Sequence, residues 1–176
     1  MKKGGHSRPG AYFVTVVVKD KEPLLGAVSG GAVALNAYGH IVQATWQALP
    51  RHYSHITIDI CTVMPTHSYG IILIDPTADH IINPTDPTTG ATMTAQGAGA
   101  REHKATLERH GLATIVRALK TLSANRINTL RNAPGKGVWG RGYYDHAICN
   151  DSDLERVRDY IRANSLHRQG KGAAPS

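Results

Sequence analysis

A very short turn between two strand-like segments constrains the fold of this chain more than any other feature. Residues 55–64 alternate between apolar and polar side chains, with isoleucines on one side, which is typical of a half-buried strand. Pro65 interrupts the pattern, and residues 68–75 resume it as a mostly apolar strand. A connection of this length cannot hold a crossover helix, so the two strands are predicted to pair antiparallel.

The remaining elements are predicted from periodicity and from helix-end signals. Further strands are expected at residues 12–19 and 138–149. Helices are expected at residues 36–50, with Asn36 as N-cap and Pro50 at the end, at residues 112–130, and from Ser152, which forms a capping box with Glu155. The Gly-rich residues 26–31 are predicted to be a loop, and residues 76–105 a surface insertion.

The length of 176 residues indicates one compact domain, here expected to span residues 11–170 between a flexible start (residues 1–10) and a flexible tail (residues 171–176). Lys and Arg number 20 against 13 Asp and Glu, which gives a formal charge of +7 and an isoelectric point near 9.6. This balance favours a polyanionic partner. Nucleic acid is favoured over a lipid surface, because no basic amphipathic helix with bulky aromatics on its other face is found.

Several kinds of protein and site are not expected. The longest apolar runs, residues 16–18 and 71–74, fall far short of the roughly 20 residues that cross a bilayer. No apolar segment follows the basic N-terminus, so a cytoplasmic protein is expected. Cys61 and Cys149 lie far apart, which predicts reduced thiols instead of a disulfide or a zinc site. The glycines of residues 135–142 do not match a Walker loop, so no nucleotide cofactor is expected.

His67 and Tyr69 are candidate metal ligands at the start of the predicted strand 68–75. Residues two apart on a strand point to the same face, so both side chains look the same way. An imidazole there can ligate a divalent metal, and a same-face neighbour can share it. The chain has ten histidines. A surface or hydrogen-bonded histidine is therefore the alternative.

Tyr160 and Asn164 are candidate site residues on the last predicted helix. They are four residues apart and so lie roughly 40° from each other around the helix axis, at the edge of the apolar stripe made by Val157 and Ile161. A phenol can act as a covalent nucleophile, and an amide oxygen beside it can help to hold a metal. The alternative is a tyrosine at the edge of the core with its hydroxyl in water.

Basic and aromatic residues are interleaved toward the C-terminus. Basic side chains occur at Lys136, Arg141, Arg156, Arg158, Arg162 and Arg168, among the aromatic residues Trp139, Tyr143 and Tyr144. Bases stack on aromatic rings while Arg and Lys hold phosphates, which favours single-stranded or hairpin nucleic acid; a solvated basic face is the alternative. The residues expected to contact nucleic acid are Lys120, Arg126, Lys136, Arg141, Tyr143, Arg158 and Arg162. Asp145 and His146 should face opposite sides of a strand, so no dyad between them is expected.

Five short segments carry a further signal through their order along the chain. They are Tyr12-Phe13-Val14-Thr15, then Ile41-Val42 with Trp46 before Pro50-Arg51, then Val63-Met64-Pro65-Thr66-His67, then Gly137-Val138-Trp139 with Tyr143-Tyr144-Asp145-His146, and finally Tyr160-Ile161-Arg162-Ala163-Asn164. Together they resemble the REP-associated tyrosine transposases, single-tyrosine members of the HUH endonuclease superfamily with an IS200-like transposase domain. The resemblance covers about residues 10–168 except for the insertion.

The resemblance implies a single α/β (α+β) domain, an antiparallel sheet flanked by helices in a ferredoxin-like arrangement. It also implies binding to hairpin-forming single-stranded DNA of repetitive extragenic palindromes, with no membrane partner. In that family a divalent ion, Mg²⁺ or Mn²⁺, is held against the phosphate that the tyrosine attacks, leaving a 5′-phosphotyrosine. Position by position, Tyr160 would be the nucleophile, and His67 and Asn164 would be metal ligands.

Two positions depart from the family pattern. Tyr69 stands where the family has its second metal-binding histidine, and Ser165 replaces the proline that follows the asparagine. A neutral phenol is a poor replacement for an imidazole ligand, so metal affinity is expected to fall. Two hypotheses follow: a metal-dependent DNA strand transferase, in which Tyr69 or water fills the remaining metal position, and a DNA-binding relative that occupies repeat hairpins without cleaving them.

Overall fold

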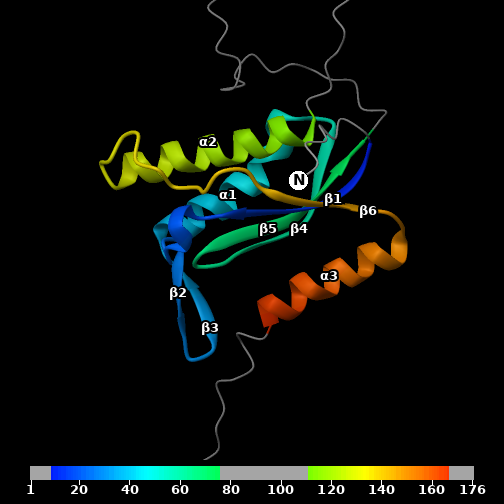
Figure 1. Ribbon diagram of the computed structural model, residues 1–176, viewed down its shortest axis with the longest axis horizontal. Coiled ribbons are helices and arrows are strands. Elements are labelled where there is room, and N and C mark those ends of the chain that lie inside the picture. Colours follow the sequence, from blue (N-terminus) through cyan, green and yellow to red (C-terminus); the bar gives the residue numbers. More distant parts are fainter. Residues whose placement is uncertain (1–8, 76–110, 167–176) are drawn as a thin grey trace, which may run out of the picture.

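A four-stranded antiparallel sheet lies at the centre of the molecule. The computed structural model describes residues 9–75 and 111–166, which form a single α+β domain (Figure 1). The strands are β1 (Gly10–Val17), β4 (Ile56–Val63), β5 (His67–Ile74) and β6 (Tyr144–Ile148), in the order β4-β5-β1-β6. Because β4 and β5 pair antiparallel across the short turn, the pairing predicted from the sequence is confirmed.

Helices α1 (Ala37–His52) and α2 (Leu112–Leu130) cover one face of this sheet (Figure 1). They bury alternate residues of β1, among them Val14 and Val16, in the main core. Trp46 of α1 is fully buried, and its indole N–H donates to Ser68 Oγ at 2.7 Å, which satisfies a polar group that would be costly to leave unpaired. The succession β1-α1-β4-β5-α2-β6 with this strand order is the ferredoxin-like arrangement that was expected.

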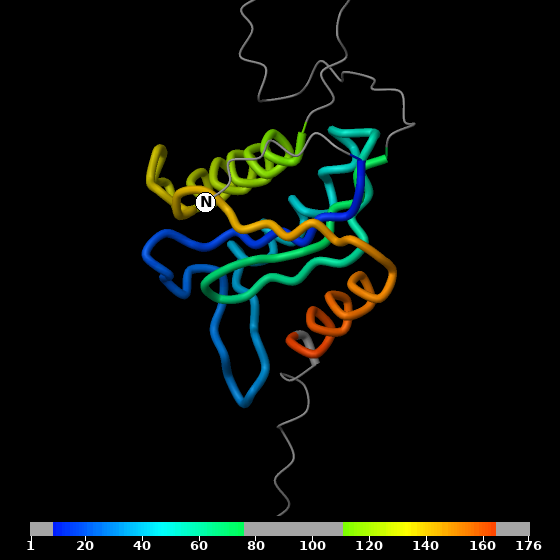
Figure 2. Tube along the Cα trace, turned by 45° about the vertical axis from the view of Figure 1, so that its right-hand side comes forward, coloured from blue at the N-terminus to red at the C-terminus, as the bar shows by residue number. Residues whose placement is uncertain are grey.

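Helix α3 (Asp151–Leu166) packs against the opposite face of the sheet, where Figure 2 shows it turning back beneath the strands after β6. Its buried residues Val157 and Ile161 join Tyr69 and Ile71 of β5 in a second, smaller apolar cluster. Phe13 of β1 packs against the same cluster. Both faces of the sheet are therefore packed against helices: α1 and α2 cover one face, and α3 covers part of the other.

The predicted loop at residues 26–31 is wrong, because this segment belongs to a β-hairpin. Strands β2 (Gly26–Ser29) and β3 (Ala32–Leu35) pair antiparallel and project from the sheet (Figure 1). Gly30 and Gly31 form the two-residue turn with positive φ angles of 59° and 80°. A pair of glycines supplies these angles at little steric cost, and their backbone twist suits a tight hairpin.

Two predicted helix ends also need correction. Asn36 caps α1 as expected, accepting from the N–H groups of Tyr38 and Gly39, but the helix continues past Pro50 to His52. The Tyr53 N–H still donates to the Leu49 carbonyl, so the proline lies inside the last turn without ending it.

The capping box predicted for the last helix is not the cap that the structure shows. Helix α3 begins at Asp151, and the side chain of Asn150 accepts from the Asp153 N–H at 2.8 Å. Asparagine is among the best N-cap residues because its side-chain oxygen satisfies an exposed helix N–H. The helix therefore starts one residue earlier than Ser152.

The remaining expectations concern segment boundaries and the membrane. The predicted insertion at residues 76–105, the tail at residues 171–176 and nearly all of the flexible start at residues 1–10 lie outside the described residues. Strand β6 is shorter than the predicted strand 138–149, although Trp139 forms an isolated bridge with Val18. No helix within residues 9–75 and 111–166 is long and apolar enough to cross a bilayer.

Candidate active site

His67 is the first residue of β5, and the turn before it fixes its side chain. The Met64 N–H donates to the His67 carbonyl at 2.8 Å, closing the β4–β5 hairpin. Thr66 Oγ1 lies 3.0 Å from His67 Nδ1, and this hydrogen bond orients the half-buried ring. Because Nδ1 is engaged by the threonine, a role in binding a ligand would use Nε2.

Tyr69 shares a face with His67, as the spacing on the strand predicts. The two rings stack with centroids 5.5 Å apart and planes 22° from parallel. Only 2% of Tyr69 is exposed, and its hydroxyl donates to Met64 Sδ at 3.8 Å. The phenol therefore fills a packed position between the strands and α3, with its oxygen turned to a thioether.

Tyr160 reaches the same face from α3. The neighbouring stripe residues Val157 and Ile161 are buried, which brings the ring of Tyr160 onto the sheet, 6.0 Å from that of Tyr69 and 6.1 Å from that of Phe13. Tyr160 nevertheless remains 55% exposed. The phenol of α3 thus lies on the same side of the sheet as the imidazole of β5, with Tyr69 in contact with both rings.

Asn164 completes the set of candidate site residues. It is half-buried and lies one helical turn beyond Tyr160, so it shares the side of α3 that faces the sheet. The structure therefore brings His67, Tyr69 and Tyr160 together on one face and leaves Asn164 at the same edge of the helix.

An ion pair with β4 anchors the middle of α3. Arg158 donates from Nε and Nη2 to the two carboxylate oxygens of Asp59, each at 2.8 Å, and also pairs with Glu155. Bidentate geometry of this kind gives strong, oriented pairing. The hydrogen bond from Arg158 lowers the pKa of Asp59 below its ordinary value, and the same bond raises the pKa of Arg158.

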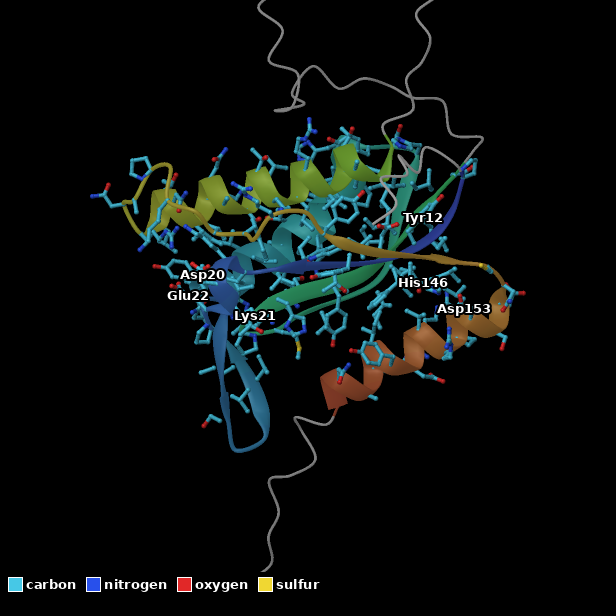
Figure 3. All side chains as sticks on the ribbon, in the orientation of Figure 1. Tyr12, Asp20, Lys21, Glu22, His146 and Asp153 are labelled. Atoms are coloured by element: carbon cyan, nitrogen blue, oxygen red, sulfur yellow. The ribbon has the colours of Figure 1, made fainter. Side chains whose placement is uncertain are left out.

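A second polar contact holds the start of α3 to β6. His146 Nε2 lies 3.0 Å from Asp153 Oδ2, and Figure 3 shows the two side chains turned toward each other between the strand and the helix. Arg156 pairs with the other carboxylate oxygen of Asp153. Hydrogen bonds from Arg156 and His146 lower the pKa of Asp153 to about 2, so this carboxylate is ionised at neutral pH.

The donor set beside Tyr160 does not fit a resident divalent ion. Among residues 9–75 and 111–166, no three His, Cys, Asp or Glu side chains gather closely enough to hold a metal. The residues expected to bind one supply a single imidazole, from His67, and the neutral amide of Asn164, while the Tyr69 hydroxyl is turned to Met64. Divalent ions in proteins are held by carboxylates or by three or more strong donors.

Comparison with solved structures shows a protein of similar fold. The structure of a REP-associated tyrosine transposase bound to a REP hairpin matches 97% of this chain and 74% of its own, with a TM-score of 0.59 and 16% identity. The fold resembles that transposase. No protein-family model matches the chain. An uncharacterized protein of Haemophilus influenzae is 25% identical over 166 residues, covering 94% of this chain and 86% of its own length.

The residues expected to contact nucleic acid are spread over both faces of the transposase-like sheet. Lys120 and Arg126 lie on α2, and Arg158 and Arg162 lie on α3, across the sheet. The Lys120 ammonium donates to the carbonyls of Gly140 and Gly142 at 2.8 and 2.9 Å, and burial lowers its pKa. Lys120 therefore holds the loop before β6, and the guanidinium of Arg158 is committed to Asp59 and Glu155.

Lys136, Arg141 and Tyr143 lie in the loop before β6. Lys136 and Arg141 are exposed, as is Arg162 on α3. Tyr143 is half-buried against the main core, and burial together with the charge of Asp145 raises its pKa. The exposed aromatic residue of this segment is its neighbour Tyr144, at 70%.

Sequence reasoning did not show that Tyr144 is the exposed member of the Tyr143–Tyr144 pair, and it missed the contact between His146 and Asp153. The adjacent aromatics Tyr143 and Tyr144 must face opposite sides of a strand. Which of them faces the core depends on the register with β1, and this is fixed by the irregular loop before β6. His146 pairs with Asp153 on the next helix.

Proposed function

We propose that the protein binds hairpin-forming, single-stranded DNA and cleaves and rejoins it through Tyr160. The observation that carries this proposal is the exposed phenol of Tyr160 on the same sheet face as His67, in a fold that resembles a REP-associated tyrosine transposase. The positive net charge supports an anionic partner, and the resemblance supports repeat hairpins as the DNA.

The proposed chemistry is a transesterification. The Tyr160 hydroxyl oxygen bonds to phosphorus and releases its proton, and the bond from phosphorus to the 3′ oxygen of the DNA breaks. That oxygen leaves with the bonding electrons and takes up a proton, giving a free 3′-hydroxyl and a 5′-phosphotyrosine. The phosphodiester energy is kept in the covalent intermediate, so the reverse attack can rejoin the strand without a nucleotide cofactor.

The other residues of the site are proposed to position the phosphate. His67 is oriented by Thr66, and its imidazole can donate a hydrogen bond to a phosphate oxygen from the start of β5. Asn164 can donate from its side-chain amide, one turn beyond the nucleophile. A divalent ion, when it is bound with DNA, would neutralise charge on the phosphate, but the donor set described above does not fit a resident one.

One observation favours a second candidate function, DNA binding without cleavage. Tyr69 is buried at the position where the resemblance places a metal-binding histidine, and its hydroxyl is turned to Met64. Loss of one metal ligand can cost several kcal/mol of transition-state stabilisation, which slows a reaction by orders of magnitude. Such a protein would still bind hairpins in a salt-sensitive manner.

The test is to mix the protein with a labelled DNA hairpin that carries an unpaired flank and to look for an adduct that survives denaturation. Parallel reactions contain Mg²⁺, Mn²⁺ or a chelator. Cleavage through Tyr160 predicts an adduct that Tyr160→Phe abolishes and that Tyr38→Phe, on α1, leaves intact. Equal adduct from Tyr160→Phe removes this residue from the chemistry, and hairpin binding without any adduct favours the second candidate.

A further inference from the structure

Among the Phe, Trp and Tyr side chains of residues 9–75 and 111–166, Tyr144 is the most exposed. It is 70% exposed, more than Tyr160, and lies at the start of the edge strand β6. A large aromatic ring that stays exposed to solvent contributes little to the stability of the fold, because that stability comes mainly from burying apolar area. Rings exposed in this manner are typical of surfaces on which nucleic-acid bases stack.

The strand register places Tyr144 on the same face as the candidate nucleophile. Thr15 of β1 pairs with Tyr69 on one side and with Tyr144 on the other, and residues directly opposite each other in a sheet point the same way. Tyr69 and Tyr144 are therefore two strand spacings apart, roughly 10 Å, with only the small Thr15 between them. The ring of Tyr160 packs against Tyr69 on this face.

The backbone that carries Tyr144 is firmly held. The preceding residue, Tyr143, packs against the main core on the opposite face of β6. The loop before it is fixed by Lys120, whose ammonium donates to the carbonyls of Gly140 and Gly142. A ring on a fixed backbone loses little conformational entropy when a ligand binds, which favours a binding role.

One basic side chain and one imidazole lie near Tyr144 and could contact a phosphate backbone. Arg141 is exposed three residues earlier, in the loop that Lys120 holds. Two residues later on the same face, His146 is held by Asp153, and its side chain is 52% exposed. Side chains two residues apart on a β-strand are about 7 Å apart, so the imidazole of His146 and the ring of Tyr144 would face the same short stretch of a bound DNA strand.

We propose that Tyr144 is a stacking platform for an unpaired nucleotide that flanks the phosphate attacked by Tyr160. The inference rests on the proposed function and adds one binding residue to it: the unpaired flank passes over β6, where Tyr144 meets it. Arg141 and His146 contact the sugar-phosphate backbone of that flank, and the ring of Tyr144 takes its base without regard to sequence, since every base has a π-face.

The test compares two labelled hairpins, one with an unpaired flank and one with a blunt end. Stacking of one base is worth ~1–3 kcal/mol, so Tyr144→Ala should weaken binding of the flanked hairpin about 5- to 150-fold. Tyr144→Phe keeps the π-face and should bind within about twofold of wild type. Leu130→Ala removes another exposed apolar side chain, on α2, and should change nothing.

A second readout reports stacking directly and does not depend on a variant's folding. The fluorescent base 2-aminopurine, placed in the unpaired flank, is quenched when it stacks on an aromatic ring. Wild type should quench it in the complex and Tyr144→Ala should not, while Tyr144→Ala keeps the melting temperature of wild type.

The possible outcomes separate this inference from the proposed function. If wild type binds flanked and blunt hairpins equally, or binds the flanked hairpin without quenching, the stacking role is overturned and the DNA-binding proposal stands. If Tyr144→Ala bound the flanked hairpin with the affinity of wild type, the stacking role would also be overturned and the DNA-binding proposal would stand. If wild type binds neither hairpin, the proposed function fails, and the inference fails with it.

Discussion

Replacing Tyr69 with histidine tests whether Tyr69 is the reason that the donor set beside Tyr160 does not fit a divalent ion, and the structure sets the cost of the change. Tyr69 is 2% exposed and packs against His67, Phe13 and Tyr160. An imidazole is about two heavy atoms smaller than a phenol and brings a polar N–H into the site, which together amount to ~2–3 kcal/mol of lost stability. For a chain of 176 residues this corresponds to a fall of roughly 4–12 °C in melting temperature.

The same substitution should create a metal response. A second imidazole at position 69 would share the sheet face with His67, giving two nitrogen donors beside the amide of Asn164. A metal that binds only the folded state stabilises it by about 2.7 kcal/mol at a hundred times its dissociation constant, which would restore most of the loss. Thermal unfolding in the presence and absence of Mn²⁺ measures both effects.

Two controls make the result specific. Tyr69→Phe keeps the ring and loses only the hydroxyl near Met64, so it should melt close to wild type and show no response to Mn²⁺. Adding His67→Ala to Tyr69→His should remove the response. If Mn²⁺ stabilised wild type as much as Tyr69→His, the reasoning from the donor set would be wrong. If Tyr69→His melted like wild type without metal, the packing argument would be refuted instead.

Two further predictions follow from the anchors of α3 and of the loop before β6. The pKa of Asp59 is lowered in the folded protein, so its pairing with Arg158 stabilises the fold above the ordinary carboxyl pKa, and this contribution is lost as pH falls through the lowered value. Asp59→Asn should therefore be less stable than wild type toward urea at neutral pH, by a margin that closes in acid; a constant margin would contradict this. Lys120→Met leaves the carbonyls of Gly140 and Gly142 without their donor, so amide hydrogen exchange around Tyr144 should speed up, and unchanged exchange would contradict the role of Lys120.

The sequence predicts those parts of the fold in which the period of the pattern is long and clear. The alternation in β4 and the three- and four-residue spacing in α1 and α2 each extend over several turns or pairs, so element type follows from the pattern. The expectation that the isoleucines of β4 lie on one side is wrong at Ile60, because the register shifts between Ile58 and Cys61 and Ile60 packs against the smaller cluster beside α3. The hairpin β2–β3 was missed because its strands are only four residues each and carry small side chains with little contrast between faces. In such a segment the glycine pair is the stronger signal, and it indicates a turn instead of a loop.

For the candidate site, geometry within one element was predictable and packing between elements was not. Strand spacing places His67 and Tyr69 on one face, and helix spacing places Tyr160 and Asn164 on one side, whatever the rest of the chain does. The burial of Tyr69 depends on where α3 docks, which involves the burial of Val157 and Ile161 and the pairing of Arg158 with Asp59, 99 residues earlier. The hydrogen bonds from Lys120 to the loop carbonyls likewise join residues far apart in the sequence. The sequence shows only the charge of Lys120, and that charge suggested a phosphate contact.

The two proposals assign hairpin binding and strand cleavage to different residues, so an experiment can separate them. Val157 and Ile161 already dock α3 by burial, and the phenolic oxygen of the 55% exposed Tyr160 is not needed for that docking. Tyr160→Phe should therefore leave the affinity for a flanked hairpin unchanged while abolishing any covalent adduct. Tyr144→Ala should reduce affinity, yet at saturating DNA it should still permit an adduct, because it leaves the nucleophile in place. If one substitution removed both properties equally, stacking and attack would have to occur at a single site, and the division of the sheet face between β6 and α3 would be wrong.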